Sequence, residues 1–312
     1  MYQIFLFKIK NYLLNFKFKY WLIYKKCQLR YLLYQTKTVE SLLPNKSNSE
    51  IITLTSHDHL LMYLICIKTF SYYSKQNFFY TVVDDGSLNK SDIKLIKKFI
   101  KNVRFIPNKE SKKILGPILK TKYYTNSLIQ KNTMVKKHIY LPLLSMKNKI
   151  LMLDSDILFY KKPLHIIKFL NDKSVDKVLF MSDYWNGYSV SKIEAKYFFK
   201  LRLISRLNGG LISYNPKETD YELIEKYLNF LSNCSYNRFI NMQTILSMMF
   251  SKKNNKLLHR LPSSYYVPFN QKNKTNTICK HFISNSSVRY RFYSEASVLL
   301  KSILSEEKLL FK

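Results

Sequence analysis

The chain has 312 residues, of which 46% are hydrophobic and 15% aromatic, and it contains five glycines. This composition excludes fibrous, low-complexity and disordered classes, and the length allows one large domain or two small ones. The formal net charge is +32, so partners with an acidic, negatively charged surface are favoured over basic ones.

The positive charge has two explanations. It could serve a polyanionic partner, such as nucleic acid, an anionic membrane face or a phosphorylated substrate. It could also reflect an AT-rich genome, because Lys, Asn, Ile, Tyr and Phe are over-used together. The charge is spread along the chain without an Arg-rich cluster, and we find no nucleic-acid-binding motif. We therefore expect no nucleic-acid partner and keep a peripheral contact with an anionic membrane open.

Residues 1–49 are predicted to be a basic, aromatic-rich extension with a linker at its end. Residues 1–45 contain one acid, Glu40, and their basic residues are interleaved with aromatic side chains: Lys8, Lys10, Lys17, Lys19, Lys25, Lys26, Arg30 and Lys37. Such a segment could lie on an anionic membrane surface, or it could form a helix or two that pack on the main domain with the lysines in solvent. Residues 44–49 have the composition of a linker.

Targeting and cysteine patterns favour a cytoplasmic location. No stretch of about 18 residues is free of charge, so no transmembrane helix is predicted. Lys8 and Lys10 follow the apolar start, which is the reverse of a signal peptide. The four cysteines form no CxxC pair and are expected to be reduced thiols. We expect a cytoplasmic protein, with peripheral attachment at the inner face of the plasma membrane as an open option.

Apolar strand patterns alternate with helical patterns from residue 51 onward, which is typical of an α/β domain with a mostly parallel sheet. Strands are expected at Ile51–Thr55, Phe78–Val83, Asn102–Ile106, Ile150–Leu153, Lys177–Ser182 and Leu207–Tyr214. Helices are expected at His59–Tyr73, Ser91–Lys101, Gln130–Leu144, Tyr221–Ser232, Asn241–Phe250 and Ser294–Phe311. Irregular structure is expected at residues 107–127 and a polar loop at residues 270–287. The predicted domain limits are 50–295, followed by a C-terminal helix at 296–312.

The most specific feature is a pair of carboxylates, Asp154 and Asp156, inside the apolar run from Ile150 to Tyr160. Burying two unpaired carboxylates side by side is costly, so a compensating partner is required. The strand at Ile150–Leu153 is expected to run through the pair and continue at Ile157–Tyr160, so both side chains point to one face of an extended chain and can share one cation. Carboxylate oxygens suit Mg²⁺ or Mn²⁺, and the end of a sheet strand is where open α/β folds bind ligands. The pair could also cap turns or face solvent, although the flanking apolar strand argues against this.

A metal at this place could clamp a diphosphate and neutralise the charge that develops when a nucleoside diphosphate leaves. A nucleotidyl- or phosphoryl-transferase could use the same carboxylates, but it would need a Gly-rich phosphate loop that the sequence lacks. The alternative from a different class is a non-catalytic basic protein that binds a membrane surface or nucleic acid.

The run Leu141–Pro163, LPLLSMKNKILMLDSDILFYKKP, resembles the core of GT-A glycosyltransferases. It is most similar to family 8, the glycogenin and lipopolysaccharide galactosyl- and glucosyltransferase type. The resemblance covers roughly residues 50–295 and implies a doubly wound, mostly parallel sheet with flanking helices, which holds the donor at its C-terminal edge. It further implies that the protein transfers a sugar from a nucleotide donor, with UDP-hexose favoured, to a glycan or lipid-linked acceptor in surface polysaccharide synthesis. The transfer is expected to depend on Mn²⁺ or Mg²⁺ and to retain the configuration of the sugar.

The same resemblance assigns site residues. The metal ligands are expected to be Asp154, Asp156 and His281, the last in the motif Lys280-His281-Phe282, although the following Gly-rich segment of the family is missing. The catalytic residues that the resemblance implies are Asp154, Asp156 and Gln243, although Met242 stands where the family usually has an acid. Asp183 is added on its position just past a strand, where it could face the acceptor or act as a base. Donor-binding residues are expected at the ends of strands and beside the metal ligands: Thr55, Ser56, Asp84, Asp85, Ser155, Asn208, Gly209, Gly210 and Lys280. Asp183 could instead be an ordinary loop acid, and Asp84 and Asp85 could simply close a turn before Gly86.

Overall fold

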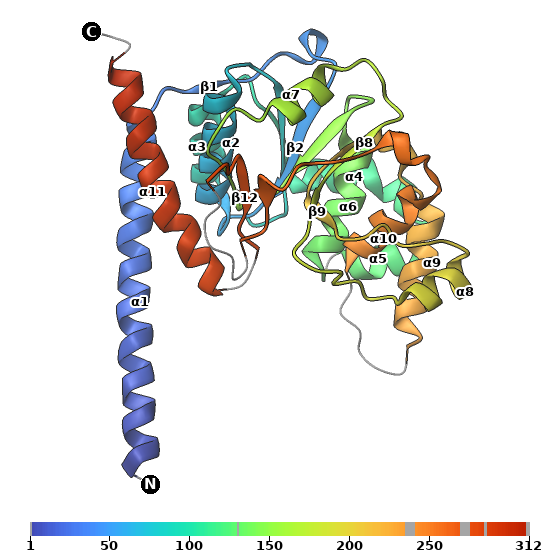
Figure 1. Cartoon of the computed structure of the whole chain (residues 1–312), viewed down its shortest axis with the longest axis horizontal. Helices are drawn as coiled ribbons and strands as arrows, with labels where there is room; N and C mark the ends of the chain where they lie inside the picture. The colour runs from blue at the N-terminus through green and yellow to red at the C-terminus, as the bar shows by residue number, and fades with distance from the viewer. Residues whose placement is uncertain (1, 130, 235–240, 269–274, 284–285, 310–312) are drawn as a thin grey trace. The chain divides into compact units, whose positions relative to one another are not determined.

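The computed structural model describes residues 2–129, 131–234, 241–268, 275–283 and 286–309, without side chains for residues 2–17, 286–287 and 289 (Figure 1). The chain forms two compact units. One unit is Thr38–His281, and the other combines Met1–Lys37 with Phe282–Lys312. Part of the polar loop expected at residues 270–287 lies outside the described residues.

The larger unit is built on a seven-stranded sheet that is parallel except at β9. The strand order is β10 (Leu258–Arg260), β8 (Val178–Ser182), β9 (Leu207–Tyr214), β6 (Ile150–Leu153), β2 (Glu50–Thr55), β3 (Phe79–Asp84), β5 (Arg104–Ile106). β9 runs antiparallel to both of its neighbours, while the other strand pairs are parallel. The expected α/β class with a mostly parallel sheet is confirmed.

Helices cover both faces of this sheet, as its apolar strands require. One face carries α2 (Leu60–Ser74) and α3 (Lys90–Phe99), and the opposite face carries a second group of helices (Figure 1). These are α4 (Asn108–Leu119), α5 (Tyr123–Ile129), α6 (Thr133–Leu144), α9 (Tyr221–Ser232) and α10 (Met242–Met249), which share one apolar core with the sheet. The remaining helices of the unit are α7 (Leu164–Asn171) and α8 (Lys192–Phe199), with short 3₁₀ turns at Pro44–Lys46, Pro216–Glu218, Phe250–Lys252 and Asn255–Leu257.

Two small sheets complete the unit. β7 (Ile157–Phe159) pairs antiparallel with β12 (Cys279–His281), which pairs in turn with β11 (Tyr265–Tyr266). β1 (Val39–Glu40) pairs with β4 (Ile100–Lys101). Because β1 is hydrogen-bonded into this unit, the compact units change after Lys37 rather than at the sequence-based boundary of residue 49.

Several expected element limits were wrong. Residues 107–127 are largely helical, in α4 and α5, rather than irregular. The helix expected at Gln130–Leu144 begins at Thr133, because the Asn132 side chain accepts hydrogen bonds from the backbone at Met134 and Val135 and so caps it. The C-terminal helix α11 (Ser286–Leu309) begins before residue 296.

The smaller unit pairs α1 (Tyr2–Gln35) with α11. Gln28 accepts a hydrogen bond from Ser297 at 3.0 Å, and the backbone NH of Lys37 donates to Glu307 at 3.0 Å. Because the partners advance together along both helices, the pairing is parallel, as Figure 1 shows. Among the described residues, no helix has the length and apolar character needed to cross a membrane.

Candidate functional site

Asp154 and Asp156 lie on a turn that carries the chain from the large sheet to a small one. β6 ends at Leu153, and the next strand, β7, begins at Ile157 and pairs with β12 instead. The expectation of one continuous strand through both aspartates was therefore wrong. The turn, rather than strand alternation, brings the two carboxylates together.

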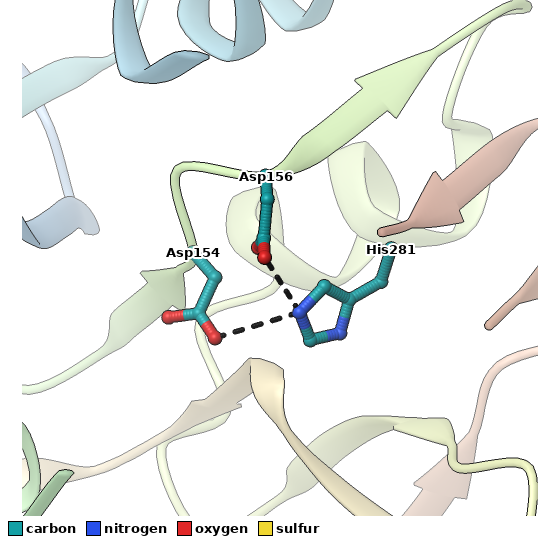
Figure 2. A group of neighbouring side chains, drawn as sticks. All are labelled: Asp154, Asp156 and His281. Carbon is teal, nitrogen blue, oxygen red and sulfur yellow. Dashed lines mark ion pairs between the residues drawn. The ribbon is translucent and has the colours of Figure 1, made fainter. Parts of the chain in front are cut away.

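His281 completes the cluster because β12 pairs antiparallel with β7, in a register that sets His281 opposite Ile157. Its Nε2 lies 3.1 Å from Oδ1 of Asp156 and 3.6 Å from Oδ2 of Asp154. Figure 2 shows the two carboxylates on the turn between β6 and β7, with the imidazole reaching them from β12. The ligand atoms of the three residues all lie within 4.8 Å of one another.

The cluster is electrostatically coupled. Burial by itself would lower the pKa of His281, but the charges of Asp156 and Asp154 outweigh burial and raise it. Burial would likewise raise the pKa of Asp156, but the imidazolium outweighs burial and lowers it. The two carboxylates thus favour the protonated form of the imidazole that lies against them.

The side chain of Asn208 fixes the orientation of the imidazole. Its Oδ1 accepts from the backbone NH of Gly210 at 2.9 Å, and its Nδ2 donates to Oδ2 of Asp183 at 2.9 Å. These two partners determine which amide atom is oxygen, since an NH cannot accept and a carboxylate cannot donate. Nδ1 of His281 lies 3.0 Å from that oxygen and must therefore donate to it. Nε2 is left as the nitrogen that faces Asp154 and Asp156.

The backbone of β9 approaches this cluster closely, and only glycine permits the approach. The NH of Asp154 donates to the carbonyl of Gly210 at 2.8 Å. A Cβ on Gly210 would lie 2.7 Å from Oδ2 of Asp154 and would overlap Cε1 of His281. At Gly209 the nearest atoms to a Cβ would be 3.3 Å away, which is tight but not prohibitive.

The donor set fits a divalent cation. Two carboxylates and one imidazole are ligands that Mn²⁺ and Mg²⁺ accept, and Mn²⁺ tolerates nitrogen better than Mg²⁺. The imidazole also has the second hydrogen bond, to Asn208, that metal-ligating histidines usually make through their other ring nitrogen. The residues present therefore fit the expected metal centre.

Residues 91–289 match the family model of nucleotide-diphospho-sugar transferases. The chain belongs to this family. No curated protein sequence matches the chain closely enough to be counted as a relative.

Solved structures of glycosyltransferases share the fold. The galactosyltransferase LgtC, solved with donor and acceptor sugar analogues, is 13% identical with a TM-score of 0.51, over 81% of this chain and 95% of its own. Mouse xyloside xylosyltransferase 1 is 11% identical with a TM-score of 0.51, over 80% of this chain and 99% of its own. The mannosyltransferase Ktr4p from S. cerevisiae is 12% identical with a TM-score of 0.50, over 78% of each chain. The GT-A fold of a nucleotide-sugar glycosyltransferase is thereby confirmed.

Lys137 is a member of the transferase site that the sequence analysis missed. Its ammonium group donates to Oδ1 of Asp154 at 2.5 Å and to the carbonyl of Gly209 at 2.8 Å. It is 5% exposed and comes from α6, where Lys136 and Lys137 stand in a run of otherwise apolar residues. Two buried lysines on an apolar helix were the signal that could have identified it.

Hydroxyl groups line the same edge of the sheet. Thr55, the last residue of β2, lies with its Oγ1 3.4 Å from Oγ of Ser155, and both residues are buried. Ser56 is turned to its own loop, where its Oγ accepts from the backbone NH of His59 at 3.3 Å. Thr55 and Ser155 thus adjoin the carboxylate turn, while Ser56 stabilises the entry to α2.

Asp84 and Asp85 bind the turn that follows β3. The carboxylate of Asp84 accepts from the backbone at Gly86, Leu88 and Asn108, at 2.7, 3.2 and 3.3 Å. The carboxylate of Asp85 accepts from the backbone and hydroxyl of Ser87 at 2.9 and 2.7 Å. Their geometry agrees with the turn-closing interpretation, and contact with a nucleotide remains a prediction.

The remaining site candidates are placed as follows. Asp183 follows β8 and reaches the cluster through Asn208, and its Oδ1 accepts from the backbone of Tyr184 at 2.6 Å. Gln243, at the start of α10, accepts from the backbone NH of Gly209 at 3.4 Å. Lys280 is buried, and its ammonium group lies 4.8 Å from the ring centre of Tyr160. Asp183 and Gln243 therefore belong to the same constellation as the metal ligands, whereas Lys280 lies over an aromatic ring.

Proposed function

We propose that the protein transfers a hexose from a UDP-hexose to a carbohydrate or lipid-linked acceptor, that the transfer depends on a divalent cation, and that it serves surface polysaccharide synthesis. The observation that carries the proposal is the convergence of Asp154, Asp156 and His281 at one edge of a GT-A sheet. Family membership supports nucleotide-sugar chemistry, and the resemblance of Leu141–Pro163 to family 8 supports UDP and retention of configuration.

The roles of the chain's residues follow from their contacts. Asp154, Asp156 and His281 would hold Mn²⁺ or Mg²⁺, which when bound supplies positive charge for the diphosphate that leaves. Asn208 orients the imidazole, and Lys137 neutralises the carboxylate oxygen of Asp154 that faces away from His281. This arrangement leaves each carboxylate with an oxygen directed at a common point.

The acceptor side is assigned to the loop after β8. Asp183 begins this loop, and Trp185 in it is 68% exposed, so its ring is available to stack on a sugar. Gln243 accepts from the backbone NH of Gly209, the residue whose carbonyl accepts from Lys137, so it is assigned to contact with either sugar. The fold does not select the donor sugar, since LgtC, Ktr4p and the xylosyltransferase are named for three different sugars.

A donor panel tests the proposal. Release of nucleotide from UDP-glucose, UDP-galactose and GDP-mannose is measured with Mn²⁺, with Mg²⁺ and with a chelator. We expect turnover of a UDP-hexose that the chelator abolishes. Asp154→Asn and Asp156→Asn should each lower it about 100-fold or more, since each removes a charge from the group that stabilises the leaving diphosphate.

Asp176→Asn is the matched control, because Asp176 is an exposed acid outside the cluster. It should keep wild-type turnover, and circular dichroism should show that all three variants are folded. Undiminished turnover in both cluster variants would contradict the proposal. Absence of nucleotide release from every donor would favour the alternative of a non-catalytic basic protein that binds a membrane surface or nucleic acid.

A further inference from the structure

The face of α1 that points away from α11 carries a stripe of tyrosines. Leu29, Leu32 and Leu33 of α1 are buried, at 0%, 8% and 2% exposure. The exposed residues Tyr20, Tyr24, Cys27, Tyr31 and Tyr34 are separated by four, three, four and three positions. At 3.6 residues per turn this spacing places them in one line along the helix. The tyrosines keep between 50% and 65% of their surface exposed. We call these five residues the tyrosine face.

Basic residues follow one edge of the tyrosine face. Lys19, Lys26 and Arg30 are separated by seven and four positions, so they form a second line between the tyrosine face and α11. Lys19 and Arg30 are exposed, and Lys26 is half-buried with its ammonium group 5.8 Å from the ring centre of Tyr293 on α11. The sequence of α1 contains no Asp or Glu, so no acid on this helix offsets the charge.

Two partners could cover such a face, and charge decides between them. The spacing of four and three is also that of a coiled-coil seam, so a second copy of α1 is one candidate. Two copies would bring together helices that each carry lysine and arginine but no acid, and the opposite charges that pair coiled-coil helices are absent. An anionic lipid surface offers the missing negative charge, and tyrosine is a residue of the membrane interface.

We propose that the tyrosine face binds an anionic lipid bilayer, with α1 lying in the plane of the headgroups. The tyrosine rings enter the headgroup layer, and Lys19, Lys26 and Arg30 contact lipid phosphates. This attachment does not depend on the transfer reaction. It would hold the protein at an anionic membrane face.

Cys27 allows this to be measured on the full-length protein. It lies within the tyrosine face and is exposed, while Cys66 and Cys279 are buried and Cys234 is partly exposed. In a Cys234→Ser background, an environment-sensitive fluorophore on Cys27 is titrated with vesicles of phosphatidylcholine, with and without phosphatidylglycerol. We expect a blue shift with the anionic vesicles alone, which weakens as salt is raised.

Two variants separate the contribution of the tyrosine rings to vesicle binding from that of the basic residues. The quadruple Tyr→Ser change at positions 20, 24, 31 and 34 should lower vesicle affinity at least about tenfold, because it removes the buried aromatic surface. Lys19→Gln, Lys26→Gln and Arg30→Gln together should lower it about fivefold per charge and reduce the salt dependence. The control is a triple change of exposed apolar residues in the larger unit, Tyr123→Ser, Ile193→Ser and Tyr197→Ser, which should bind as wild type.

Other results would overturn the proposal. One is equal binding to neutral and anionic vesicles, and another is wild-type affinity in the tyrosine variant. A third is that light scattering shows a dimer of the wild type but not of the tyrosine variant, while neither the wild type nor the variant binds vesicles. That result would assign the tyrosine face to a second copy of the chain. If the tyrosine variant fails to fold, the fluorophore on the otherwise unaltered chain and the charge variant still decide.

Discussion

At the scale of single residues, the site holds two partly exposed acids next to each other by giving each a basic partner. Asp156 is compensated by the imidazolium of His281 and Asp154 by the ammonium group of Lys137. Each acid therefore has its own basic partner, which lowers the penalty for an unpaired charge that is partly withdrawn from water. A divalent cation would replace the proton on His281 as the charge between the carboxylates.

Replacement of Asn208 by leucine should weaken Mn²⁺ binding about 10- to 100-fold, which is the usual effect of losing the hydrogen bond that orients a ligating histidine. Leucine is close in shape but cannot accept from Nδ1 of His281. Mn²⁺ binding without nucleotide is measured by electron paramagnetic resonance. Asn208→Asp keeps an acceptor for His281 and should retain more affinity. Equal affinity in wild type and Asn208→Leu would show that the imidazole is oriented by other contacts.

Mn²⁺ affinity should also rise with pH. Metal ligands bind in their deprotonated form, so the cation competes with the proton on His281. Because the carboxylates raise the pKa of His281 above its ordinary value, this competition extends above that value and ends only when pH exceeds the raised pKa. Calorimetry in buffers of different ionisation enthalpy should detect proton release on binding near neutral pH. The absence of proton release would mean that His281 is neutral or does not bind the metal.

Sequence alone identified the site residues that belong to a recognisable local motif. Asp154 and Asp156 were predicted from a carboxylate pair in an apolar run, and His281 and Asn208 from short motifs. The structure brings them together. Lys137 was not predicted as a site residue because its contact with Asp154 depends on how α6 packs against β9. No local sequence pattern encodes that packing.

At the scale of elements, β9 is the strand that assembles the site. It runs antiparallel between β8 and β6, and through Asn208, Gly209 and Gly210 it touches His281, Lys137 and Asp154. Gly210 lets the backbone pass where a side chain would overlap His281 and Asp154. The strand itself was predicted, but its antiparallel direction was not, because hydrophobic pattern does not encode strand direction.

Gly210→Ala should abolish Mn²⁺ binding and lower the free energy of unfolding by about 1–3 kcal/mol, because the new methyl group overlaps His281 and Oδ2 of Asp154. Gly209→Ala is the matched control. Its methyl group would meet atoms no closer than 3.3 Å, so a smaller loss of stability and retained metal binding are expected. Metal titration and urea denaturation check both. Equal behaviour of the two variants would contradict the close packing described at Gly210.

At the scale of the whole molecule, the two ends of the chain form one helical unit and the middle forms the catalytic one. The basic composition of the N-terminal segment was evident from sequence, and its helical state was one of two options. The parallel pairing of α1 with α11 could not be read from sequence, because it joins segments about 270 positions apart, as in the contact of Lys37 with Glu307. Such long-range pairing depends on the fold of everything between.

Leu29→Ala should loosen the helical unit without affecting the site. Leu29 is fully buried, so the cavity should cost about 2–5 kcal/mol of local stability. Faster amide hydrogen exchange in α1 and α11, with unchanged Mn²⁺ affinity, is expected because every site residue lies in Thr38–His281. Val298→Ala, at a position 70% exposed, is the control and should exchange as wild type. Loss of metal binding in Leu29→Ala would mean that the two units do not behave separately.

The central claim is that Asp154, Asp156 and His281 form a metal-dependent site for a nucleoside diphosphate. It is tested most directly by thermal unfolding with UDP, GDP or CDP, each with and without Mn²⁺, in wild type, Asp156→Asn and the control Asp176→Asn. A ligand that binds the native state raises the melting temperature by mass action. We predict a rise of several degrees with UDP that requires Mn²⁺, persists in Asp176→Asn and is lost in Asp156→Asn. A melting temperature that no nucleotide changes, or a rise with UDP that is the same without metal and in Asp156→Asn, would contradict the account.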